Sequence, residues 1–248
     1  MKKITLEPSL YSTELRKPKM SCDGRLSEKR NIKAPYPNNK AFFLATIGAP
    51  GSGKTTNILS AMSKQSKNDN IYYKIFSDII YVCPTSSQAS IVDSPLADLS
   101  KDNIFNELST DVYDKITENY EKYMEQEIPS KYNQLIIIDD CGATLKSAVN
   151  QEMLSQLSMN RRHLHLSIIL IGQYTVSIPR SVRAQLSHVC LYKPSRQDIS
   201  TIQSEFTDLG KSEFNHLSKF VWKEKHDCLW INLQTNEMYK NLEKIILE

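Results

Sequence analysis

The chain has 248 residues and a mass of 28.4 kDa, which suits one large domain or one domain with appendages. Apolar residues make up 40% and charged residues 24%, which argues against global disorder, and the net charge of +3 does not by itself indicate a polyanion as partner. Apolar runs such as Leu135–Ile138 and Ile168–Ile171 are far shorter than the roughly 20 residues of a membrane-spanning helix, so we expect no membrane span.

Charge is unevenly distributed along the chain. Residues 1–40 hold ten Lys or Arg against four Asp or Glu, 97–140 is acidic, and 146–196 is basic with Glu152 as its one acidic residue. This segregation weakly favours a polyanion partner, although solvated faces that balance each other explain it equally well. The five cysteines form no CxxC pair, which argues against a disulfide scaffold or zinc knuckle and for a reducing compartment.

The chain divides into an arm and a body. Residues 1–40 lack a clear period and contain four prolines, which predicts a basic, loosely ordered arm. The remaining residues, 41–248, are predicted to form one α/β domain. Short apolar runs typical of buried strands lie at Ala41–Ile47, Asp78–Cys83, Gln134–Ile138, Ser167–Gly172 and His188–Tyr192.

Helical patterns alternate with these runs. They lie at Thr55–Lys64, Val112–Gln126, Gln151–Met159, Ser195–Phe206 and Ser212–Lys219, the last two each opening with a Ser suited to an N-cap. Asn103–Leu108 fits a short strand or a helical turn. The C-terminal part predicts a hairpin and a helix: Lys219–Lys223 pairs with Cys228–Asn232 around a polar turn, and Glu237–Leu247 is helical. This alternation predicts a mostly parallel sheet covered on both faces.

Glycine is concentrated at one place. The chain has only seven, about 3% against a usual value near 7%, and three of them lie in one six-residue window. That window belongs to Gly48-Ala49-Pro50-Gly51-Ser52-Gly53-Lys54-Thr55, which matches G-x-x-x-x-G-K-[ST] at every fixed position. A predicted strand precedes it and a helix follows, as a phosphate-binding P-loop requires.

The residue types of this motif suit a nucleoside triphosphate. Glycines let successive N–H groups form an anion nest at a helix start, Lys54 can reach the β- and γ-phosphates, and the Thr55 hydroxyl can ligate Mg²⁺. Thr56 is included among the binding residues, with its role left open. An N-K-x-D element for guanine is absent from the sequence, so ATP is the expected nucleotide.

Polar side chains follow two later strands. Leu135–Ile138 leads directly into Asp139 and Asp140. Asp139 is expected to hold Mg²⁺ through water, opposite Thr55. Asp140 is expected to act as base or to position water, although a loop-capping role is the alternative. Gln173 follows the next strand and is expected to sense the γ-phosphate or orient the attacking water, unless it is an ordinary strand-end residue.

Arginines suggest a second cation for the reaction. Arg161 and Arg162 precede a buried strand, where they form either a solvated turn or an arginine finger inserted into a neighbouring subunit. Arg180 and Arg183 are later candidates for catalysis or for contacts with DNA phosphates.

Together these motifs resemble the genome-packaging ATPases of large DNA viruses, the poxvirus-type branch of the FtsK–HerA superfamily. The resemblance covers about residues 40–200 and lies in GAPGSGKTT, in the strand ending in Asp139-Asp140-Cys141, and in the segment from Arg162 to Gln173. It departs from broader relatives at Asp140, where many carry Glu. We expect no separate DNA-reading domain after residue 235.

The resemblance implies a RecA-like P-loop ATPase core over residues 41–248 that hydrolyses ATP to ADP and phosphate with Mg²⁺. It also implies a homo-oligomeric ring, pentamer or hexamer, that pumps double-stranded DNA into a preformed capsid, contacts portal or vertex proteins, and works in the virion and host-cell cytoplasm. By position, Gly48–Thr55 bind phosphates and Mg²⁺, Asp139 and Asp140 form the second acidic motif, Arg162 or Arg161 is the arginine, and Gln173 is the sensor.

Two other functions fit parts of the sequence. A nucleotide or small-molecule kinase would share the P-loop, but Asp140 and Gln173 favour water as the acceptor. A nucleotide-gated assembly protein would form rings on ATP binding, with slow turnover that DNA does not stimulate.

Overall fold

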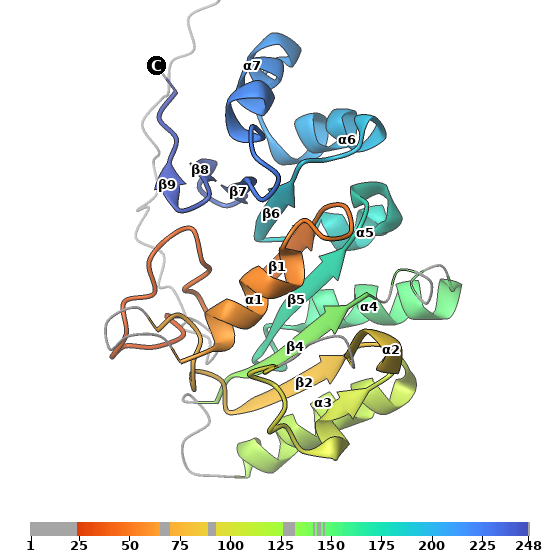
Figure 1. Cartoon of the computed structure of the whole chain (residues 1–248). Helices are drawn as coiled ribbons and strands as arrows, with labels where there is room; N and C mark the ends of the chain where they lie inside the picture. Colours follow the sequence, from red (N-terminus) through yellow and green to blue (C-terminus); the bar gives the residue numbers. More distant parts are fainter. Residues whose placement is uncertain are drawn as a thin grey trace, which may run out of the picture.

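The computed structural model describes residues 24–64, 70–88, 93–125, 132–140, 142, 145 and 147–247. Its centre is a nine-stranded sheet in the order β3-β2-β4-β5-β1-β6-β7-β8-β9 (Figure 1). The strands are β1 (Phe43–Ile47), β2 (Asp78–Val82), β3 (Ile104–Phe105), β4 (Gln134–Asp139), β5 (Leu166–Gly172), β6 (His188–Tyr192), β7 (Cys228–Asn232), β8 (Glu237–Lys240) and β9 (Glu243–Lys244). The α-helices are α1 (Lys54–Met62), α2 (Thr85–Gln88), α3 (Thr110–Met124), α4 (Ala148–Asn160), α5 (Arg180–Arg183), α6 (Arg196–Phe206) and α7 (Lys211–Val221).

The sheet is mostly parallel. Strands β1 to β6 pair in parallel, while β7, β8 and β9 extend the sheet in antiparallel order. β1 lies between β5 and β6, and all its residues are buried, as are those of β4. Near-continuous apolar runs form such strands because helices cover both faces of the sheet. The predicted α/β fold with a mostly parallel sheet flanked by helices is confirmed.

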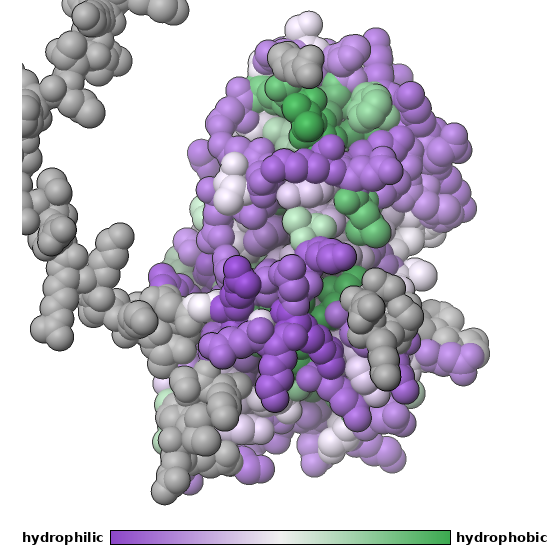
Figure 2. All heavy atoms as spheres, turned by 90° about the vertical axis from the view of Figure 1, so that its left-hand side faces the viewer, coloured by the Kyte–Doolittle hydropathy of each residue, from purple (hydrophilic) through white to green (hydrophobic). Residues whose placement is uncertain are grey.

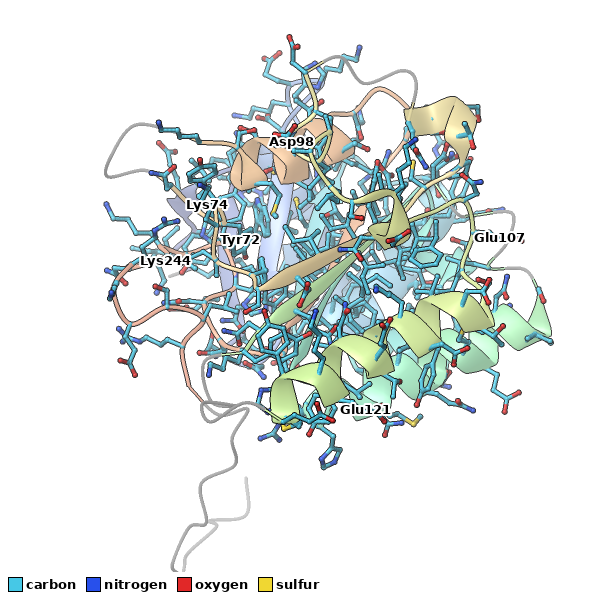
Figure 3. All side chains as sticks on the ribbon, turned by 90° about the horizontal axis from the view of Figure 1, so that it is seen from below. Tyr72, Lys74, Asp98, Glu107, Glu121 and Lys244 are labelled. Carbon is cyan, nitrogen blue, oxygen red and sulfur yellow. The ribbon has the colours of Figure 1, made fainter. Side chains whose placement is uncertain are left out.

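One face of the sheet packs against α3 to α7. Phe43 and Ala45 of β1 point to this face, where apolar residues of these helices complete a single cluster. From α3, the cluster includes Val112 and Ile116, both fully buried. Figure 3 shows α3 across the lower side of the molecule, with Glu121 pointing away from the sheet. Helix α3 is therefore amphipathic, with a charged outer face as predicted from the sequence.

The other face packs against α1 and the chain that precedes β1. Leu26 and Ile32 are buried in this second cluster, together with Tyr72, whose hydroxyl donates a 2.9 Å hydrogen bond to the Pro37 carbonyl. Figure 3 shows Tyr72 among the interior side chains. Residues 24–40 of the predicted arm thus pack against the sheet, whereas residues 1–23 lie outside the described residues.

The C-terminal prediction is wrong in two respects. The segment expected to be a helix, Glu237–Leu247, instead contains β8 and β9. The hairpin joins β7 to β8 and not to Lys219–Lys223, because most of that segment forms the end of α7. The Asn232 side chain accepts two backbone N–H bonds in the connecting turn. Such a turn brings the following segment back beside β7, so strand pairing overrides the weak helical preference of the Glu- and Lys-rich sequence.

Local signals at the helix starts give mixed results. The Ser195 hydroxyl caps α6 by accepting the Asp198 N–H at 3.2 Å, as predicted. Helix α7 starts one residue before Ser212, and its cap is Gly210, whose N–H donates to the Glu213 carboxylate at 2.7 Å. The ambiguous Asn103–Leu108 segment contains β3, which follows a short 3-10 turn, Lys101–Asn103.

The surface turned to the viewer in Figure 2 is mostly hydrophilic, with apolar side chains gathered near its upper end. Figure 1 places α7 and the C-terminal strands at this end. Among the described residues, no helix combines the length and apolar character needed to cross a bilayer.

Candidate active site

The carboxyl ends of three adjacent parallel strands, β4, β5 and β1, meet at one edge of the sheet. A cavity of about 640 Å³ lies there. Residues from all three strand ends line it, among them Lys54, Thr55, Asp139, Asp140 and Gln173. Ligands of open α/β sheets bind at this edge, because the loops after the strands diverge there. The topology therefore brings together the P-loop, the acid pair and the strand-end glutamine that the sequence predicted as one site.

The P-loop needs glycine at three points for different reasons. Gly51 and Gly53 have φ angles of +70° and +103°, a region that side chains rarely adopt. At Gly48, a Cβ atom would lie 2.5 Å from the Cβ of Tyr192 on β6, so no side chain fits. The concentration of glycine in this window is explained by backbone geometry and by the close packing of β6.

Side chains behind the P-loop fix its exit into α1. The Tyr192 hydroxyl donates to the Gly53 carbonyl at 3.3 Å and accepts from Asn57 at 3.0 Å. The Asn57 side chain in turn accepts from the Tyr36 hydroxyl at 2.7 Å. Sequence reasoning missed this support, because the three residues are joined only when β6 and the segment before β1 pack around α1.

Lys54 lies at the cavity with its ammonium donating to the Ala49 carbonyl at 2.9 Å. Burial lowers the pKa of Lys54, and the opposite charges of Asp139 and Asp140 act against that shift. The cation therefore lies folded back over the loop, within the same cavity as both carboxylates. Phosphate oxygens entering the loop would provide it with further anionic partners.

Thr55 and Asp139 join the ends of β1 and β4. The Thr55 hydroxyl donates to the Asp139 carboxylate at 2.9 Å, and Asp139 is only 6% exposed. Burial raises the pKa of Asp139, whereas the hydrogen bond from Thr55 acts in the opposite direction. A hydroxyl and a carboxylate in contact are the oxygen donors that Mg²⁺ prefers. These residues fit a Mg²⁺ ion bound with a nucleotide.

Asp140 differs sharply from its neighbour. It is exposed, its φ of +52° is left-handed, and its carboxylate accepts a 2.6 Å hydrogen bond from the Ser87 hydroxyl of α2. Asp tolerates a left-handed backbone because its short side chain can bond locally, which favours Asp over the longer Glu here. Ser87 also lines the cavity and was missed from the sequence, although it follows β2, the strand beside β4.

Gln173 follows β5 at the cavity, and the loop after it is tied to α6. Arg183 of α5 makes a bidentate ion pair with Glu205, at 2.6 and 2.8 Å, and also donates to the Thr175 and Ile178 carbonyls. The Asp198 carboxylate accepts the Val176 N–H at 3.2 Å. Arg183, a sequence candidate for catalysis or DNA contact, thus holds this loop in place.

Arg161 and Arg162 lie away from the cavity of their own chain. They connect α4 to the amino end of β5, whereas the cavity lies at the carboxyl ends. Arg161 donates to the Ala41 carbonyl at 3.0 Å and to the Ser158 carbonyl, and burial lowers its pKa. Arg162 is exposed. Within one chain, the structure does not bring either arginine to the P-loop, and Arg161 already has a structural role.

Comparisons with known proteins agree with this architecture. The model of a family described as "Poxvirus A32 protein" matches residues 36–217. The chain is 24% identical over 176 residues to the uncharacterized protein 015R of Frog virus 3, which covers 68% of this chain and 49% of that protein. The chain therefore spans about half the length of this curated relative.

Two solved structures share the fold. The DNA-packaging ATPase B204 of Sulfolobus turreted icosahedral virus has a TM-score of 0.52 at 14% identity, covering 84% of this chain and 98% of that chain. EssC (ATPases 2 and 3) of Geobacillus thermodenitrificans has a TM-score of 0.53 at 11% identity, covering 82% of this chain and 40% of that chain. At these identities the similarity is one of fold.

Proposed function

This chain belongs to the Poxvirus A32 protein family of packaging ATPases, and on that premise we propose that it hydrolyses ATP to move double-stranded DNA into a viral capsid. The observation that carries the proposal is the contact between the Thr55 hydroxyl and the Asp139 carboxylate. It joins the P-loop to the acidic strand end at one cavity, next to Gln173. A phosphate nest, paired oxygen donors and a strand-end amide suit hydrolysis of a triphosphate.

Each residue has a distinct proposed role. The P-loop from Gly48 to Thr56 holds the phosphates, and Lys54 neutralises charge on the β- and γ-phosphate oxygens. Thr55 and Asp139 hold Mg²⁺, which supplies charge neutralisation on the phosphates when bound. Asp140 accepts a proton from, or orients, the attacking water, and Gln173 positions that water.

We further propose that the active assembly is a homo-oligomeric ring. An arginine from a neighbouring chain would complete the site, and Arg162 is the better candidate because it is exposed, whereas the Arg161 guanidinium already donates to the Ala41 and Ser158 carbonyls. Basic residues of the 1–40 arm and of 146–196, apart from the internally bonded Arg161 and Arg183, would contact DNA phosphates without reading bases. Contacts with capsid portal or vertex proteins, and work at a viral assembly site in the host cytoplasm, complete this proposal.

The test is ATP turnover by the purified chain with Mg²⁺, with and without double-stranded DNA of unrelated sequences. We expect ADP and free phosphate as products, stimulation by any sequence, and DNA binding that weakens steeply as salt rises. Lys54→Ala should abolish turnover, while Lys64→Ala, which removes the same charge from an exposed site just after α1, should not. Product formed only on a small-molecule acceptor would indicate a kinase instead.

The mass of the protein in solution, measured with an ATP analogue and with DNA, separates the ring from the remaining alternative. A motor should form a ring whose turnover rises with DNA. Rings that assemble on ATP binding, yet hydrolyse slowly and ignore DNA, would indicate a nucleotide-gated assembly protein. Salt-independent DNA binding would contradict phosphate contacts.

A further inference from the structure

The turn between α7 and β7 reaches the back of the P-loop. Its residue His226 is exposed, and its Nδ1 lies 2.9 Å from the Ser52 carbonyl oxygen. A carbonyl only accepts hydrogen bonds, so Nδ1 carries the proton and donates. The ring also lies close to the next residue, since a Cβ atom on Gly53 would be 3.4 Å from Nδ1.

This bond determines where the following N–H group points. A trans peptide is planar, so the carbonyl of one residue and the N–H of the next point in opposite directions. Holding the Ser52 carbonyl toward His226 therefore turns the Gly53 N–H away from His226. The neighbouring Gly53 carbonyl is held similarly, by the Asn57 N–H at 2.9 Å and by the Tyr192 hydroxyl, which orients the Lys54 N–H. Successive N–H groups fixed in this way form an anion nest.

The turn that carries His226 is itself firmly built. The Asp227 carboxylate accepts the Glu224 N–H at 2.9 Å and the Asn241 amide at 3.0 Å, and pairs with the Lys240 ammonium at 3.1 Å. Burial opposes ionisation of Asp227, but these bonds outweigh it and lower its pKa to about 2. The imidazole is thus presented to the P-loop by a turn anchored to the hairpin of β7 and β8.

Resting on the ATPase function proposed above, we propose that His226 is a positioning residue that presets the phosphate-binding conformation of the P-loop. It acts through the Ser52 peptide and does not touch the nucleotide's reacting atoms. His226 lies beyond residues 36–217, the part matched by the family model, so the C-terminal segment contributes to the site. Without the His226 side chain the Ser52–Gly53 peptide is free to rotate, and part of the nucleotide binding energy is then needed to order it.

The experiment compares His226→Ala, His226→Asn and Lys225→Ala in the full chain. Asn places an amide N–H close to the position of Nδ1, and Lys225 is the exposed neighbour in the same turn. The probe is a fluorescent methylanthraniloyl ADP with Mg²⁺, titrated to obtain Kd. Thermal unfolding without nucleotide is measured on the same samples. Since one hydrogen bond is lost, we expect His226→Ala to bind roughly fivefold to tenfold more weakly.

His226→Asn and Lys225→Ala should bind within about twofold of the unchanged protein, the scatter expected when no hydrogen bond is lost. All variants should unfold at similar temperatures. For His226→Ala, KM for ATP should rise while kcat stays nearly unchanged, because the substitution weakens binding of the substrate and of the transition state equally. Equal affinity of His226→Ala and the unchanged protein overturns the inference, as does failure of Asn to rescue. If the unchanged protein itself binds no nucleotide, the proposed ATPase function is refuted. If the unchanged protein binds nucleotide and His226→Ala binds it equally well, only the role of His226 is refuted.

Discussion

Lowering the pH from 7 to 4.5 should destabilise this protein through His188. The residue begins β6, is 6% exposed, and pairs in register with Leu44 of β1 and Asn232 of β7. Burial lowers its pKa from 6.5 to about 4. Between these values the unfolded chain binds a proton that the folded chain does not, so the free energy of unfolding falls as pH falls through this window. From the two pKa values, the loss between pH 7 and pH 4.5 is about 2 kcal/mol.

The assay is urea denaturation at half-unit pH steps, on the unchanged protein and on His188→Gln. Other buried groups also contribute to the pH dependence, among them His165, whose pKa is lowered by burial. The difference between the two curves isolates His188, because contributions common to both proteins cancel. We expect His188→Gln to lose about 2 kcal/mol less stability than the unchanged protein over this range. Parallel curves would refute the reasoning, as would an imidazole signal of His188 that titrates near 6.5 by NMR.

Four further predictions concern the site and the residues that support it. Asp140→Asn should retain ATP and lower turnover by at least about a hundredfold, the usual contribution of a general base, in a combined binding and phosphate-release assay; near-normal turnover would assign Asp140 to loop capping. Arg161→Ala should lower the free energy of unfolding by about 1–3 kcal/mol, because two backbone carbonyls lose a charged donor. Arg162→Ala, in contrast, should keep nucleotide affinity and lose turnover in the oligomer. Mixing Arg162→Ala with Lys54→Ala subunits should restore part of that turnover, and no restoration despite normal assembly would exclude a finger between chains. Gly48→Ala should cost about 1–3 kcal/mol of stability through its clash with β6, measured by thermal unfolding, and an unchanged midpoint would show that β6 can move.

Sequence patterns predicted the parts of the fold that depend on local chemistry. Buried parallel strands read as continuous apolar runs, so all five long parallel strands were found near their observed bounds. The P-loop and the acid pair were expected to meet, and Thr55 contacts Asp139 as that expectation required. Both successes follow from one rule: parallel strands end at the same edge, so polar residues after them share a site.

The missed features depend on pairings between distant segments. Ser87 meets Asp140 because β2 is the neighbour of β4 in the sheet, an order that the sequence alone does not give. The sequence suggests Arg183 for catalysis or for contacts with DNA phosphates, but α6 brings Glu205 to it. The prediction of a C-terminal helix was wrong because the intrinsic helix propensity of Glu and Lys is small in energy, and the pairing of β8 with β7 outweighs it.

The two acidic residues at the end of β4 are adjacent in sequence yet fixed by different forces, and this separates what each can do. Asp139 is buried and bonded to Thr55 of α1, so its position depends on the packing of the sheet and the P-loop together. Asp140 is exposed, has a left-handed backbone, and bonds to Ser87 of the short helix α2. A metal ligand benefits from a rigid, preset position, whereas a group that handles a proton must meet water at the cavity. The sharp change of backbone direction between the two residues gives each carboxylate the environment that its proposed role requires.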